Sequence, residues 1–83
     1  MPLSAEELAT QRELLNVYRR NAIVYQRQFS MHQAAHVPPI IYNGLRETLR
    51  QITRLKQVIR EGGGYVTDRA EDTFDLSALE TGS

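Results

Sequence analysis

A chain of 83 residues without cysteine forms at most one small domain, and neither a disulfide nor a thiolate metal site can stabilise it. No segment approaches the roughly 20 continuous apolar residues of a membrane span, and no signal-peptide pattern opens the sequence, so we expect a cytoplasmic protein with no membrane contact. The net charge of +0 conceals an asymmetry: basic residues predominate between Thr10 and Glu61, and acidic residues predominate from Gly62 onward.

The first expected element is a helix from about residue 4 to residue 35. Ser4 is a suitable N-cap, and Glu7 completes a Ser-x-x-Glu capping box. Neither Gly nor Pro follows before Val37-Pro38-Pro39, and good helix formers are plentiful. A seven-residue repeat, typical of a helix that pairs along its whole length, places four residues in the expected core: Leu8, Leu15, Ala22 and Phe29.

A turn over residues 36–38 and a second helix over 39–61 follow. Pro39 suits the first turn of that helix, and Gly62-Gly63-Gly64 ends it, one glycine supplying the left-handed cap. Gly44 indicates either a close approach of the first helix or a weak helix start, and we favour the close approach. The second helix contributes the rest of the expected core: Ile41, Leu45, Leu49, Ile52, Leu55 and Ile59.

Residues 62–83 form the second expected region, an acidic and flexible tail that is mostly disordered. Tyr65 or Val66 can fold back onto the end of the hairpin. Phe74, Leu76 and Leu79 have the spacing of a short linear motif that orders on a partner, although a plain disordered tail is the favoured interpretation.

Together these features predict an all-α fold, a long antiparallel helical hairpin of coiled-coil type. One seam between two helices buries little apolar surface, so a scaffold of this size needs another source of stability. The first helix also carries more apolar surface than one seam uses, which predicts self-association into a four-helix bundle or a larger stack. The candidate interface residues are Leu14, Val17, Tyr18, Val24, Tyr25 and Met31.

The sequence offers no residue set for catalysis, so we expect no enzyme and no cofactor. His32 and His36 have a metal-binding spacing on a helix, but no third ligand lies nearby in sequence, so we expect no metal site. Basic residues of the second helix form a stripe that suits phosphates or an acidic protein surface, including the acidic tail itself. These candidate contacts to an anionic partner are Arg46, Arg50, Arg54 and Arg60.

Several segments together resemble the helical-hairpin adaptor modules of bacterial multidomain signalling and defence proteins, which lie beside TIR, caspase-like or NACHT/STAND-type NTPase domains. They are Tyr18-Arg19-Arg20-Asn21, His36-Val37-Pro38-Pro39, Asn43-Gly44-Leu45-Arg46-Glu47, and the run from Ile52 to Arg60. The resemblance implies a non-enzymatic adaptor that clusters or recruits an effector protein. The sequence itself carries no effector domain, so it is either an excised module or a small protein acting in trans. The alternative is a basic hairpin that binds nucleic acid and is regulated by its acidic tail.

Overall fold

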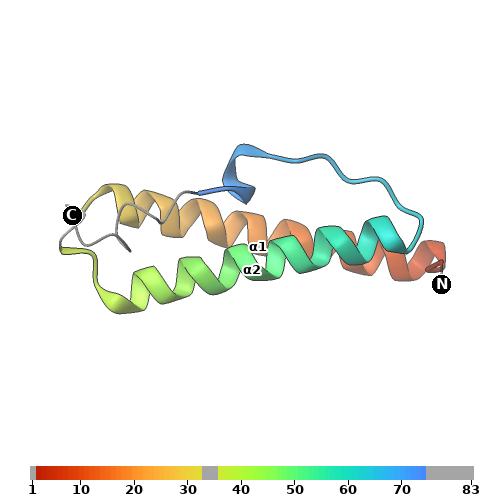
Figure 1. Cartoon of the computed structure of the whole chain (residues 1–83), viewed down its shortest axis with the longest axis horizontal. Helices are drawn as coiled ribbons and strands as arrows, with labels where there is room; N and C mark the ends of the chain where they lie inside the picture. The colour runs from red at the N-terminus through yellow and green to blue at the C-terminus, as the bar shows by residue number, and fades with distance from the viewer. Residues whose placement is uncertain (1, 33–35, 75–83) are drawn as a thin grey trace.

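The computed structural model of the chain describes residues 2–32 and 36–74 (Figure 1). Two long helices, α1 (Ala5–Ser30) and α2 (Pro39–Glu61), lie side by side and antiparallel, and a short 3-10 helix, η2 (Ala70–Asp72), follows. None of the described residues forms a strand. The all-α hairpin predicted from the sequence is therefore confirmed.

The N-terminus of α1 has the expected capping box, but its C-terminus differs from the prediction. Ser4 Oγ accepts a hydrogen bond from the Glu7 N–H at 3.1 Å, and Glu7 Oε1 accepts one from the Ser4 N–H at 3.2 Å. The helix ends at Ser30, not near residue 35, and the Met31 N–H bonds back to the carbonyls of Arg27 and Gln28. No local residue type marks this end, because the chain stops being helical where it must begin to reverse toward α2.

The bounds of α2 agree with the sequence prediction, since both ends carry residues with strong backbone preferences. Pro39 occupies the first turn, where its missing N–H costs nothing. At the other end Gly63 has φ +92°, and the Gly64 N–H donates to the Ile59 carbonyl at 2.8 Å. This is the left-handed cap expected of the glycine run.

The core lies between the helices. Among the expected core residues, Leu8, Phe29, Ile41 and Leu49 are half-buried. At Gly44 a Cβ atom would lie 2.6 Å from Cζ of Tyr25, so the favoured close approach is present, with an aromatic ring of α1 filling the space. The remaining expected core residues are fully buried: Leu15, Ala22, Leu45, Ile52, Leu55 and Ile59.

Residues 64–74, which we call the strap, run back along the hairpin and lie against both helices (Figure 1). Val66 is only 8% exposed and joins the hydrophobic core, and the ring of Phe74 meets that of Phe29 edge-on with centroids 5.0 Å apart. Where the sequence predicts a flexible tail, the strap is thus packed on the hairpin through an apolar anchor and a buried carboxylate. Residues 75–83, with Leu76 and Leu79 of the possible linear motif, lie outside the described part of the chain.

Candidate interaction site

Large apolar side chains are exposed along the outward face of α1 and at Met31, the residue that caps its C-terminus. The exposed fractions are 41% for Leu14, 37% for Val17, 52% for Val24 and 83% for Met31. Their helix buries Leu15 and Ala22 against the rest of the hairpin, so the hairpin does not use these four residues to build its own core.

Two of the six candidate interface residues lie elsewhere. Tyr18 is half-buried and packs against the hydrophobic core, and Tyr25 is half-buried over Gly44. Both rings therefore cover the edge of the seam between α1 and α2, an environment that suits an amphipathic side chain.

The four exposed apolar residues belong to a longer pattern in which positions alternate in steps of three and four. Asn21 and Gln28, which are both exposed, fill the two gaps. At 1.5 Å per residue this face runs for about 25 Å along the helix. The apolar pattern of the sequence does not indicate Asn21 and Gln28, because both side chains are polar, although the alternating spacing is visible in the sequence. We call the six residues the outer stripe: Leu14, Val17, Asn21, Val24, Gln28 and Met31.

A buried ionic cluster fastens the strap to both helices. Arg19 donates from Nε to Asp72 Oδ1 at 2.9 Å and from Nη2 to Asp72 Oδ2 at 2.8 Å. Lys56 of α2 donates to the same Oδ2 at 3.0 Å, and Arg19 Nη2 also reaches the Thr67 carbonyl at 2.7 Å. The side chains of Arg19, Asp72 and Lys56 are 7%, 1% and 10% exposed. The sequence gives Arg19 no role beyond surface charge, because its partner lies 53 residues away.

The environment of Asp72 favours the ionised carboxylate. Burial alone would raise its pKa, but hydrogen bonds from Arg19, from the Arg69 N–H and from Lys56 outweigh burial and lower the pKa to about 2. At the exposed edge of the cluster, hydrogen bonds from Lys56 and then from Arg60 lower the pKa of Asp68. The cluster thus holds the strap against the helices with the carboxylates of Asp68 and Asp72 both ionised.

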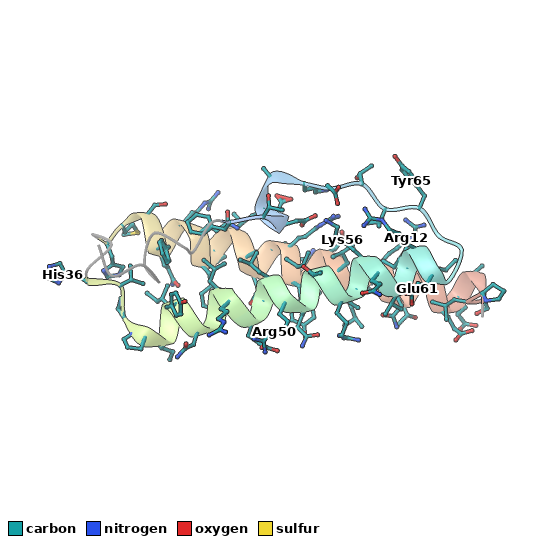
Figure 2. The ribbon with its side chains drawn as sticks, in the orientation of Figure 1. Arg12, His36, Arg50, Lys56, Glu61 and Tyr65 are labelled. Carbon is teal, nitrogen blue, oxygen red and sulfur yellow. The ribbon has the colours of Figure 1, made fainter. Side chains whose placement is uncertain are left out.

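The basic residues expected to contact an anionic partner divide into two groups. Arg46, Arg50 and Arg54 are exposed on α2, and Figure 2 shows Arg50 on the opposite side of the hairpin from Tyr65 of the strap. Arg50 has only a 3.4 Å contact with Glu47. Arg60 instead turns to the strap, where Nη2 donates to the Val66 carbonyl at 3.2 Å and to Asp68 at 3.1 Å. The free basic surface is therefore narrower than the sequence suggests.

A second basic feature is a groove of about 250 Å³ between α1 and the strap, whose lining includes Arg12, Arg19 and Arg69. Arg12 donates to the Tyr65 carbonyl at 2.6 Å, and Figure 2 shows the two labelled residues near each other at one end of the hairpin. Two of these guanidinium groups are thus already used to hold the strap.

His36 lies at the tip of the turn (Figure 2), and among residues 2–32 and 36–74 no group of three or more His, Asp or Glu side chains is arranged to hold a metal ion. Within the same ranges no helix is both long and apolar enough to cross a membrane. Comparison with protein-family models, with curated proteins and with solved structures gives no match.

Proposed function

We propose that this chain is a non-enzymatic interaction module that assembles with further copies of itself and thereby clusters or recruits an effector protein. Its setting would be cytoplasmic bacterial signalling or antiviral defence, as the resemblance to adaptor hairpins implies. The observation that carries the proposal is the outer stripe, in which four exposed apolar side chains, three on α1 and Met31 at its C-cap, lie outside the core of the hairpin.

The energetic argument rests on the size of these side chains. Fully burying one side chain such as Leu, Val or Met contributes about 1.5–3 kcal/mol relative to leaving it exposed. Four of them in one row offer a substantial gain to any partner that covers them. Met31 at 83% and Val24 at 52% exposure have the most to gain. Exposed apolar side chains gathered along one face mark interaction sites more often than scattered single residues do.

The exposed group Arg46, Arg50 and Arg54 favours the alternative of nucleic-acid binding, with one residue per helical turn facing solvent. Deleting the strap does not test this alternative cleanly, since it leaves Arg19 buried without the Asp72 carboxylate. Changing all three arginines to Gln tests it without disturbing the strap. If the native chain binds DNA or RNA with steep salt dependence and the triple variant loses that binding, the alternative gains support.

The proposal is tested by placing a charge on the outer stripe. We expect Leu14→Asp and Val24→Asp each to dissociate the assembly while helicity is retained, because a carboxylate on this face is solvated in the monomer but desolvated in the complex. Ile52→Asp, at 0% exposure, should instead unfold the hairpin. Mass from light scattering after size exclusion and helicity from circular dichroism give the two readouts.

The matched control is Ile40→Asp, which puts the same charge on a residue that is 79% exposed on α2, outside the stripe. We expect this variant to assemble like the native chain. A native chain that is monomeric at all accessible concentrations and captures no partner, or a stripe variant that assembles as well as the control, contradicts the proposal.

A further inference from the structure

We infer that the partner of the outer stripe is a second copy of the same chain, docked α1 to α1 in parallel and in register, with Asn21 facing Asn21. The inference rests on the proposed function and specifies its geometry. It begins from the spacing along the stripe, where steps of three and four alternate without a break from Leu14 to Met31. This is the heptad spacing by which one helix packs against another, with Leu14, Asn21 and Gln28 at the a positions and Val17, Val24 and Met31 at the d positions.

A surface with this repeat is complementary to itself, since the same knobs and holes recur on both helices. The exposed face of α2 has no such row, because it presents Arg46, Arg50 and Arg54. Among the described surfaces of the hairpin, the outer stripe is thus the one whose pattern calls for another helix of the same kind. A second copy supplies it without any further partner.

The two polar members of the stripe select the parallel orientation. In a parallel pair each a residue faces its own counterpart, so the amide of Asn21 bonds to the other Asn21 and Gln28 meets Gln28. In an antiparallel pair a residues face d residues. The full overlap that sets Leu14 against Met31 would then place Asn21 opposite Val24 and Gln28 opposite Val17. Each of these layers would bury an amide without a partner, which is unfavourable because its donors and acceptor lose their hydrogen bonds to water.

The charges beside the outer stripe also favour the parallel orientation. Arg20 and Arg27 occupy the flanking g positions and are exposed. In the antiparallel overlap, the g positions of one chain face the g positions of the other. Arg20 of each chain would therefore lie beside Arg27 of its partner, which gives two pairs of like charges. In the parallel pair they lie opposite the e positions, which are Tyr25 and His32. Of these two arrangements, the parallel one keeps Arg20 and Arg27 of the two chains apart.

This geometry bears directly on clustering. Phe74 packs on Phe29, which lies in the last turn of α1 near the turn of the hairpin. In a parallel dimer the two Phe74 residues lie toward the same end. In an antiparallel dimer they would lie toward opposite ends of a body whose longest dimension is 45 Å. Parallel docking thus brings the C-terminal ends of the two straps to the same side of the assembly.

The orientation is tested by cross-linking, which the absence of native cysteine makes clean. With Gln28→Cys, the two new thiols face each other in the parallel dimer, and we expect an interchain disulfide on mild oxidation of the folded protein. In the antiparallel overlap each new thiol would instead face Val17, about 16 Å along the helix from the thiol of the other chain. The matched control is Gln57→Cys, exposed on α2, which should stay uncross-linked.

The outcomes separate this inference from the proposed function. A dimer by light scattering in which the Gln28→Cys chains cross-link supports both. A dimer without that cross-link, in which a mixture of Leu14→Cys and Met31→Cys chains gives the mixed disulfide, overturns the parallel arrangement and leaves self-association intact. A monomer that docks a different protein on the stripe also overturns the inference, and a monomer without any partner overturns both.

The Asn21 layer has its own test. Asn21→Asp preserves the shape of the side chain but sets two carboxylates face to face, so we expect at least a roughly tenfold weaker dimer at neutral pH. Lowering the pH toward 4 should restore part of the affinity as the carboxylates protonate. The control Asn43→Asp makes the same chemical change at an exposed site on α2. An unchanged dissociation constant for Asn21→Asp overturns the inference.

Discussion

Arg19 has an environment that its sequence neighbours do not reveal. It follows Tyr18 and precedes Arg20, which is exposed, yet Arg19 is only 6% exposed itself. A guanidinium group taken out of water is stable only when its charge and its donors are matched. Asp72 provides the charge and two acceptor oxygens, and the Thr67 carbonyl accepts a further bond. The two adjacent arginines therefore differ in role: Arg19 holds the strap within the fold, and Arg20 lies at the surface.

At this scale we predict that Asp72→Asn lowers the free energy of unfolding by roughly 3 kcal/mol, because it leaves Arg19 and Lys56 buried without their shared counter-charge. Urea unfolding followed by circular dichroism measures the change. Asp68→Asn is the matched control, since its side chain is 70% exposed although it pairs with the same Lys56, and its effect should be much smaller. Equal losses in the two variants would contradict the role assigned to Asp72.

The two helices differ in how far their sequences define them. The bounds of α2 were predictable because Pro39 and the glycine run restrict the backbone locally, whatever surrounds them. The end of α1 was not, since the residues after Ser30 remain acceptable helix formers and only the reversal of the chain stops the helix. The sequence allowed Val66 to fold back onto the hairpin, as it does, but it did not place Asp72, because the partners of that carboxylate lie far away in sequence. Of the outer stripe, the sequence predicted the four apolar residues but not the two polar ones.

The contact between the helices at Gly44 gives a prediction at the scale of the element. In a helix interior Ala is favoured over Gly by about 1 kcal/mol, but here a Cβ would meet the ring of Tyr25 at 2.6 Å. We therefore expect Gly44→Ala to be neutral or destabilising in the native chain. In a Tyr25→Ala background, where the ring is absent, the same change should stabilise by about 1 kcal/mol.

A double-mutant cycle measured by chemical unfolding gives this coupling directly. If Gly44→Ala stabilises both backgrounds equally, the ring does not limit the approach of the helices. Gly63→Ala serves as a reference for backbone strain, since φ +92° disfavours any side chain there irrespective of Tyr25.

For the molecule as a whole, the strap turns a two-helix seam into a three-part structure. Val66 adds to the core, the Arg12 side chain donates to the Tyr65 carbonyl, and Gln26 donates to the Glu71 carbonyl at 2.9 Å. Asp72 is hydrogen-bonded to residues of both α1 and α2. Because one carboxylate contacts both helices, losing it should loosen the strap and the hairpin in the same transition, so the folded unit extends at least to Phe74 and does not stop at Glu61.

Because of this arrangement, we expect the free energy of unfolding to decrease as the pH falls. The pKa of Asp72 is lowered from 3.8 to about 2 in the folded chain, so the folded state binds its proton less readily than the unfolded state. The stabilisation is fully present above pH 4 and is lost as the pH falls through the folded pKa, with a total of about 2 kcal/mol. Urea unfolding at one protein concentration, repeated from pH 6 to pH 2, should show the native chain losing stability more steeply below pH 4 than Asp72→Asn. All other carboxylates are present in both proteins, so their effects on the pH dependence largely cancel when the two curves are compared. Parallel curves would mean that the ionised Asp72 does not hold the strap to the hairpin.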